Sequence, residues 1–278
     1  MRIFHTVIAL LFFSFCFQAI AFIPKGMVIL QKTAENNGSG GYIIEQEVQF
    51  QTAPEPIVLK ETWIVDNENS MRLTVTGTKE LKDLFKMQFS YSGGVRTSLV
   101  GSTKQSKKLS DDFIERYFHI RNADSYANHL LQLKIANSSI FQKKIIRAAK
   151  DFDNSPEDFV RLSRTGGVVN YAFGTPAISE SADSSPGFWI EQDQFVLRKF
   201  RLPSGVEVSA EKYSQYARGL NFPRKRSVRW DNNTVQIQTL SVAGKGPGSS
   251  GALEATRTES LDSLSNKNII LEFYNRYR

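Results

Sequence analysis

Residues 42–50 read YIIEQEVQF. Apolar and polar side chains alternate here, with Tyr42, Ile44, Val48 and Phe50 on one side and Glu45, Glu47 and Gln49 on the other. Successive side chains of a strand point to opposite faces of its sheet, so this period of two predicts a strand with one buried face. The core is therefore expected to rest on a β-sheet.

The same alternation recurs further along the chain. The other predicted strands are 59–65, 71–76, 85–91, 95–100, 168–173, 187–191, 195–202, 206–216, 226–230 and 235–242. Turn-forming residues separate them, as at 66–69, 203–205 and 221–223. This spacing predicts a meander, in which each strand pairs with the next one along the chain.

Between the two sets of strands the apolar residues recur at helical spacing. Phe113, Ile114, Tyr117 and Phe118 predict one helix, and a second is predicted over 125–135. A third is expected to begin at Ser155, with the serine as N-cap and Pro156 in the first position, and to end near Arg164.

The remaining segments are less regular. The polar, glycine-rich residues 32–41 are expected to form a loop, whereas 141–152 fit a helix or a strand. Residues 261–277 predict a short amphipathic helix after a flexible linker at 244–251. Strands, then helices, then strands indicate an α+β fold with an antiparallel sheet and helices on one face.

The first residues have the order of a secretory signal peptide. Arg2 supplies a positive charge, residues 3–17 are apolar, and Ala19-Ile20-Ala21 is a small-residue cleavage pattern, so cleavage is expected after Ala21. The alternative is a membrane anchor, but the apolar run is short for a span and no Lys/Arg cluster follows it. The expected organisation is a signal peptide at 1–21, a domain at 22–243, and a linker and tail helix at 244–278.

Composition narrows the class of protein. Cys16, inside the predicted signal peptide, is the only cysteine, which excludes disulfides, a thiol nucleophile and thiolate metal sites after cleavage. An exported chain without disulfides fits a bacterial periplasm. The formal net charge of +7 is spread along the chain, which argues against a nucleic-acid partner and is compatible with an anionic membrane surface.

Catalytic and metal-binding signatures are missing from the sequence. It contains no G-x-S-x-G motif and no P-loop. His119 and His129 are not at a metal-ligand spacing, and a surface or partly buried helical histidine is the simpler interpretation. The carboxylates are scattered on the polar faces of strands. We therefore expect no enzyme activity, no cofactor and no metal.

Aromatic residues are the conspicuous feature. The chain has 20 Phe, 9 Tyr and 3 Trp, and many of them fall on single faces of predicted strands. Such faces form a core in most proteins. Large, soft side chains also suit an adaptable apolar cavity, and a large sheet with few helices leaves a face to be covered. Both interpretations stay open on this ground.

Several short motifs resemble the LolA-like outer-membrane lipoprotein-sorting superfamily. In the second half they are GGVVNYAFG at 166–174, PGFWIEQDQFVLR at 186–198 and GLNFPR at 219–224. In the first half ETWIV at 61–65, followed by MRL at 71–73, is similar to the family's early strand pair. The resemblance covers roughly residues 40–242.

The resemblance implies a strongly curved antiparallel half-barrel with helices covering its concave face. It also implies a periplasmic carrier that shields acyl chains, with a lipid or acylated lipoprotein as ligand and inner- and outer-membrane proteins as partners. The residues expected to line the apolar groove are Phe50, Trp63, Leu73, Phe85, Met87, Phe89, Trp189 and Phe200.

One departure from the family pattern matters. Lipoprotein carriers have an arginine after the early aromatic strand that holds the lid shut, whereas this chain has Asp66-Asn67-Glu68. The alternative function is therefore an envelope interaction or stress-sensing module on the same fold. The basic tail with Arg276 and Arg278 is an addition to the family pattern, and the sequence does not give the oligomeric state.

Overall fold

The computed structural model describes residues 23–51, 56–82, 84–141, 159–174, 185–246, 252–258, 261–262, 264 and 266–278. The predicted signal peptide, with its cleavage after Ala21, lies outside these residues. So do the predicted helix start at Ser155 and all of the stretch 141–152 except Phe141.

The described strands form one antiparallel sheet of 13 strands, in the order β6-β5-β4-β3-β2-β1-β13-β12-β11-β10-β9-β8-β7. Its first half comprises β1 (Tyr42–Phe50), β2 (Ile57–Asn67), β3 (Ser70–Gly77), β4 (Lys86–Ser92), β5 (Val95–Val100) and β6 (Thr103–Lys108). Its second half comprises β7 (Arg161–Thr165), β8 (Val168–Phe173), β9 (Gly187–Glu191), β10 (Leu197–Arg201), β11 (Glu207–Gln215), β12 (Asn221–Trp230) and β13 (Asn233–Gly244).

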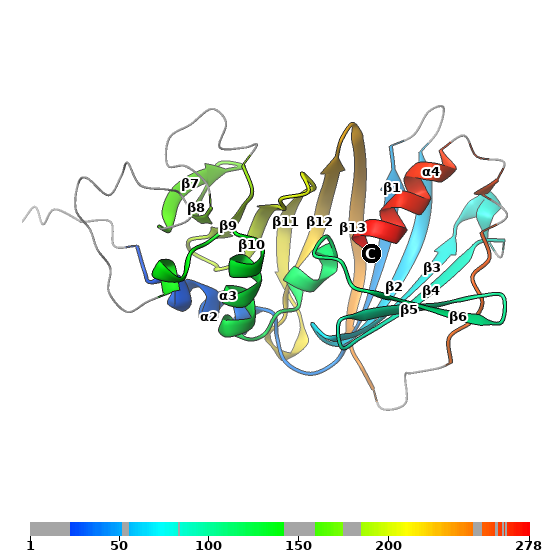
Figure 1. Ribbon diagram of the computed structural model, residues 1–278, viewed down its shortest axis with the longest axis horizontal. Helices are drawn as coiled ribbons and strands as arrows, with labels where there is room; N and C mark the ends of the chain where they lie inside the picture. Colours follow the sequence, from blue (N-terminus) through cyan, green and yellow to red (C-terminus); the bar gives the residue numbers. More distant parts are fainter. Residues whose placement is uncertain are drawn as a thin grey trace, which may run out of the picture.

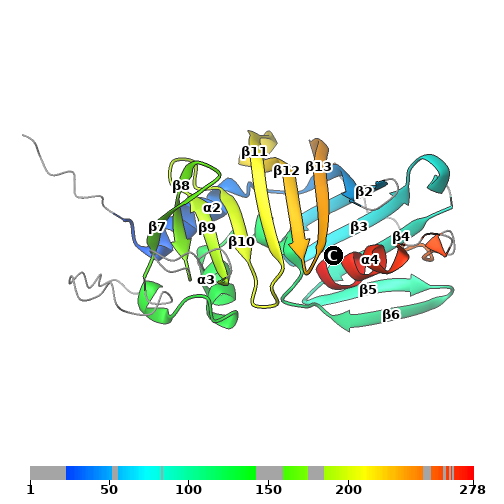
Figure 2. The ribbon, with the colours of Figure 1, turned by 90° about the horizontal axis from the view of Figure 1, so that it is seen from above.

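Each half is a meander, as predicted, and the halves join where β1 pairs with β13. Tyr42 lies opposite Gly244 and Phe50 opposite Val235. The sheet is open, because its edge strands β6 and β7 lie at opposite ends of the molecule (Figure 1). Strands β3–β6 run across the direction of β11–β13 in Figure 2, so the sheet bends strongly between its halves.

Among the described residues the helical segments are few and short. They are α2 (Gly26–Asn36), η1 (Lys79–Leu81), η2 (Ile114–Phe118), α3 (Ala123–Gln132), η3 (Ser138–Phe141), η7 (Ala217–Gly219), α4 (Lys267–Glu272) and the π-helical turn η9 (Phe273–Tyr277). Helices α2 and α3 lie side by side next to β9 and β10, and α4 lies against the first half of the sheet (Figures 1 and 2). The side chain of Asn122 accepts hydrogen bonds from the amides of Asp124 and Ser125, which fixes the start of α3.

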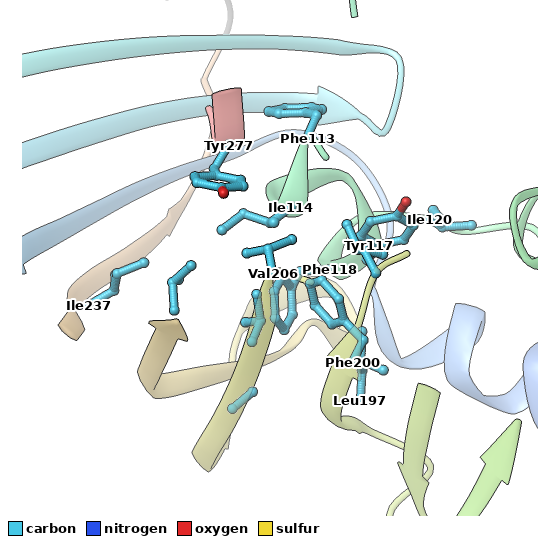
Figure 3. Packing of buried hydrophobic residues seen from close by; sticks show 14 of the residues in the cluster. Phe113, Ile114, Tyr117, Phe118, Ile120, Leu197, Phe200, Val206, Ile237 and Tyr277 are labelled. Carbon is cyan, nitrogen blue, oxygen red and sulfur yellow. The ribbon is translucent and has the colours of Figure 1, made fainter. Parts of the chain in front are cut away.

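The segment 113–120 fills the space inside the bend. Figure 3 shows Ile114, Tyr117 and Phe118 between the strands and Tyr277. The predicted helix here is a short 3₁₀ turn, η2, all of whose residues are buried. An amphipathic α-helix keeps one face in water, and this segment has no face left for solvent.

The predicted loop at 32–41 is wrong up to Asn36, because α2 extends through it. The buried positions are Gly26, Ile29, Leu30, Thr33 and Ala34, and their spacing is that of one helix face. The polar residues at 31, 32, 35 and 36 lie on the other side of this helix, which explains why they suggested a loop.

The helix predicted to end near Arg164 is wrong over its described part. Arg161–Thr165 forms β7, which pairs with β8 through a turn at Gly166-Gly167. Both glycines have positive φ, at 58° and 81°, as the tight two-residue hairpin turn requires. The glycine pair therefore makes a hairpin and does not end a helix.

The turn predicted at 221–223 is also wrong, because β12 begins at Asn221. Pro223 lies opposite Tyr213 of β11, and pairing with β13 begins only at Lys225. Proline lacks an N–H, so it is tolerated where its strand has a single neighbour.

Gly174→Ala is expected to lower the free energy of unfolding by about 1–3 kcal/mol more than Gly205→Ala, the usual cost of overpacking. Both glycines have positive φ, but a Cβ at Gly174 would lie 2.5 Å from Ile135 Cγ2 and 2.7 Å from the Ile135 oxygen, whereas at Gly205 it meets nothing within 4 Å. Urea denaturation of the two variants measures the difference. Equal losses of unfolding free energy in the two variants would mean that the positive φ, and not the contact with Ile135, determines the cost.

Candidate functional site

The candidate site is the face of the sheet that carries Phe50, Trp63, Leu73 and Phe89, called here the apolar face. Trp63 lies opposite Leu73, and Leu73 lies opposite Phe89, so one row of buried side chains crosses β2, β3 and β4. Ile44 of β1 extends the row, because it lies opposite Trp63.

The structure brings most of the predicted lining residues together. One connected buried cluster contains Phe50, Trp63, Leu73, Phe85, Met87, Phe89 and Phe200. Trp189 is buried outside this cluster. It alternates with Phe188, which stacks on Phe200 at 5.2 Å, and the ammonium of Lys199 lies 4.9 Å from the Trp189 ring. Trp189 therefore lies on the opposite face of the sheet.

The apolar face is covered by the chain's own residues 266–278, called here the C-terminal plug. The rings of Phe273 and Phe50 are 5.5 Å apart, edge to face, and Phe273 also stacks on Trp230 at 5.8 Å. Tyr277 lies 5.1 Å from Trp230. Figure 1 shows α4 against β1 and β2. The expected amphipathic tail helix is thus shorter than predicted, and it packs on the domain.

A short segment before the plug, residues 254–257, pairs with two strands of the first half of the sheet. Ala255 and Arg257 form isolated bridges with Leu99 of β5 and Lys86 of β4. The Lys86 ammonium lies 2.6 Å from the carboxylate of Glu254. Residues 254–257 therefore run between two strands before the chain reaches the apolar face.

Four charged side chains form a buried cluster where the plug meets the sheet. Arg278 donates to both carboxylate oxygens of Glu61 at 3.1 Å and to Glu115 at 2.8 Å. Arg226 donates to the same Glu115 oxygen at 2.8 Å and to Gln46 at 2.7 Å. None of these side chains is more than 2% exposed. Two carboxylates thus face two guanidinium groups, and the charges balance.

Neighbouring groups fix the protonation states in this buried charge cluster. Burial would raise the pKa of Glu115, but Arg226 and Arg278 outweigh it and hold that pKa well below its usual range. Burial lowers the pKa of His119, so its imidazole is neutral at pH 7. His119 Nε2 lies 3.2 Å from Glu115, to which a neutral imidazole can donate.

A second arginine site holds the end of the plug. Arg96 of β5 donates to the backbone oxygens of Tyr274 at 2.6 Å and Arg278 at 2.8 Å. Its guanidinium also lies 4.7 Å from the ring of Phe89. Lys107 of β6 donates to the Asn275 oxygen at 2.7 Å. Positive side chains near the last carbonyl groups of a helix interact favourably with the negative end of its dipole.

The buried charge cluster was not predicted from the sequence, although one signal of it was present. Glu61 shares the strand face of Leu59 and Trp63, and Gln46 shares the face of Ile44 and Val48. A polar residue in the buried phase of a strand needs a partner. That partner could not be named, because Arg278 lies 217 positions from Glu61.

Neither a metal-binding cluster nor a membrane-spanning helix is present in the described ranges. No group of three or more His, Cys, Asp or Glu side chains lies close enough together there to hold a metal ion. His119 is fully buried, in contrast to the surface or partly buried position expected. The helices in these ranges are all too short or too polar to cross a bilayer.

Acid is expected to weaken the fold through Glu115. Because its pKa is lowered from the usual 4.5, the carboxylate contributes stability in full above that value and loses it as the pH falls toward the folded-state pKa. His129 acts in the same direction, since burial lowers its pKa to about 4 and the unfolded chain takes up the proton first.

Urea denaturation of the native chain and of Glu115→Gln, at several pH values from 7 to 3, tests the contribution of Glu115. The difference in unfolding free energy is expected to be largest at neutral pH and to shrink below pH 4.5. A difference that stays constant across the range would contradict this account.

Comparisons with known proteins place the fold. No protein-family model matches the sequence, and no curated protein matches it. The structure is similar to a LolA superfamily protein from Nitrosomonas europaea, with a TM-score of 0.50 and 13% identity over 81% of this chain and 95% of that one.

Two further solved structures are similar to the chain. One is an outer membrane lipoprotein-sorting protein domain from Vibrio parahaemolyticus, with a TM-score of 0.46 and 12% identity over 88% of this chain and 97% of that one. The other is a DUF1329 family protein from Desulfovibrio piger, with a TM-score of 0.47 and 10% identity over 81% of this chain and 93% of that one. The resemblance to the LolA superfamily is confirmed for the fold.

Proposed function

We propose that this protein binds acyl chains of lipoproteins or other lipids in the periplasm and carries them toward the outer membrane. The observation that carries the proposal is the row of buried apolar side chains across β2–β4, on a fold similar to that of a LolA superfamily protein. The periplasmic location rests on the predicted signal peptide. Each methylene of a buried acyl chain supplies about 0.8 kcal/mol, so binding needs no catalysis.

In this proposal residues 22–243 form a half-barrel with helices covering its concave face, and 244–278 are a linker and tail. The side chains proposed to line the groove are Phe50, Trp63, Leu73, Phe85, Met87, Phe89 and Phe200. We leave out Trp189 because it lies on the other face of the sheet. A ligand has to share or replace the contacts that the C-terminal plug makes with Phe50 and Trp230.

Native mass spectrometry of the protein purified from a bacterial periplasm, with lipid extraction of the same sample, tests the proposal. An adduct whose mass matches an extracted acylated species is the expected result. A protein that is empty, and that also fails to take up a fluorescent fatty acyl probe, would overturn it.

A second candidate is an interaction or stress-sensing module that binds a partner protein. It is favoured by the C-terminal plug, because the apolar face is already covered by the protein's own side chains. Pull-down of the tagged protein would then recover one specific partner at equal yield with and without added lipid. A yield that falls when lipid is added would favour the carrier.

A further inference from the structure

The C-terminal plug is held by two kinds of contact. Ile270, Phe273, Tyr274 and Tyr277 are buried against the aromatic side chains of the sheet. Arg278 is fully buried between Glu61 and Glu115 and lies 5.5 Å from the ring of Trp63. Buried apolar side chains beside one buried cation are the chemistry of a positively charged amphiphile.

The plug is a short and irregular element. Its α-helix spans only Lys267–Glu272, has no side chain capping its N-terminus, and passes directly into the π-helical turn Phe273–Tyr277. Isolated helices of this length are not stable in water, so the plug depends on its contacts with the sheet. An element of this kind can be exchanged for a ligand that makes equivalent contacts.

The charges left behind define what can replace the plug. Without Arg278, Glu61 keeps the hydrogen bond from Trp63 Nε1 at 3.0 Å, and Glu115 keeps Arg226 and His119. Two carboxylates then face one guanidinium in a buried site. An uncompensated buried charge is strongly destabilising, so the group that takes the place of the Arg278 guanidinium has to be positive. Arg96 loses the carbonyl oxygens of Tyr274 and Arg278 at the same time, and it needs an acceptor from the ligand or from water.

Buried polar atoms around the plug are also available to a ligand. Tyr91 Oη, Gln46 Nε2 and Trp230 Nε1 have no hydrogen-bond partner among the described residues. Tyr91 stacks on Trp63, and Trp230 packs against Tyr277. Buried polar groups are normally satisfied, so these atoms indicate that the plug is an incomplete match to the apolar face.

We propose that the C-terminal plug is a displaceable occupant of the binding site, and that the displacing ligand is a lipid with a positively charged group. Its hydrocarbon chain lies along Phe50, Trp63 and Leu73, and its ammonium takes the place of the Arg278 guanidinium between Glu61 and Glu115. This inference rests on the proposed acyl-binding function and specifies the class of lipid.

Three probes of equal chain length test the charge preference: dodecylamine, dodecanol and dodecanoic acid, each titrated at pH 7 below its aggregation concentration. Dodecylamine is expected to bind at least about tenfold more tightly than dodecanoic acid, which corresponds to about 1.4 kcal/mol. In Glu61→Gln this preference is expected to shrink severalfold, whereas Glu211→Gln, at an exposed position of β11, should leave it unchanged.

Equal affinity for all three probes, or a preference for dodecanoic acid, would overturn the inference and leave acyl binding standing. Failure of every probe to bind would instead overturn the proposed function. The outcomes of the two proposals are therefore distinguishable in one experiment.

Displacement of the plug is tested by cross-linking it covalently to the sheet. Lys107 and Asn275 are exposed and in contact, so Lys107→Cys with Asn275→Cys can be joined by a short reducible methanethiosulfonate linker in the signal-free chain. The matched control joins Thr97→Cys to Ser106→Cys across β5 and β6, away from the plug.

Cross-linking the plug is expected to weaken dodecylamine binding at least about tenfold, with recovery on reduction, and the control linkage should have no effect. Binding that is unchanged by the plug linkage would show that the plug need not move and would overturn the displacement. Circular dichroism of both cross-linked proteins establishes that each is folded.

Discussion

Glu115→Gln is expected to lower the free energy of unfolding by about 3–5 kcal/mol, the cost of removing one partner from a buried ion pair. Arg226 and Arg278 both donate to one oxygen of Glu115, and none of the three side chains is exposed by more than 2%. The uncharged amide of the glutamine leaves Glu61 as the one carboxylate that faces Arg226 and Arg278. Urea denaturation at pH 7, followed by far-UV circular dichroism, measures the loss.

The comparison variant is Glu211→Gln, which makes the same chemical change at an exposed position and should cost less than about 0.5 kcal/mol. Combining Glu115→Gln with Arg278→Gln leaves one carboxylate and one guanidinium, so the double variant should lose less than the sum of the two single losses. Additive losses would show that Glu115 and Arg278 do not act as a pair.

Trp63→Ala is expected to cost about 3–5 kcal/mol, as for other buried tryptophans cut back to alanine. Trp63 stacks on Tyr91 at 5.6 Å, lies 6.3 Å from the ring of Phe113, and donates from Nε1 to Glu61. Removing it opens a cavity under the C-terminal plug and leaves Glu61 with one partner fewer.

Trp63→Phe separates the two effects, because it keeps an aromatic ring and removes the Nε1–H donor. Its loss should fall to about 1–3 kcal/mol, which is the cost of leaving a buried acceptor with fewer hydrogen bonds. If Trp63→Ala cost less than about 1 kcal/mol in the same denaturation experiment, the apolar face could not be the tightly packed surface described here.

Most strand positions could be predicted because, in strands such as β1, β2 and β3, buried side chains alternate with more exposed ones. The strand at 42–50 has the predicted bounds and the predicted buried face. Strand β6 could not be found, since Thr103–Lys108 is exposed throughout and has no apolar side to give a period. The second half of α2 was taken for a loop because its buried residues, Thr33 and Ala34, lie among polar neighbours.

The apolar side chains of the candidate site could be predicted for the same reason, and its charges could not. The alternation of apolar and polar residues along the strands places Trp63 and Leu73 on one face, but it carries no information on which residues cover that face. The contact of Glu61 with Arg278 joins positions 217 apart and depends on the path of the chain through residues 252–258. Such a contact is decided by tertiary structure alone.

The open ends of the sheet bear on how copies of this protein meet. An edge strand with unpaired backbone groups can recruit the edge of another molecule. Here β6 carries the exposed Lys104, Lys107 and Lys108, and β7 carries the exposed Arg164. Two copies that approach edge to edge therefore repel each other, and salt screens that repulsion over a Debye length of about 3 Å at 1 M. Light scattering of the purified protein should accordingly show self-association that increases with ionic strength.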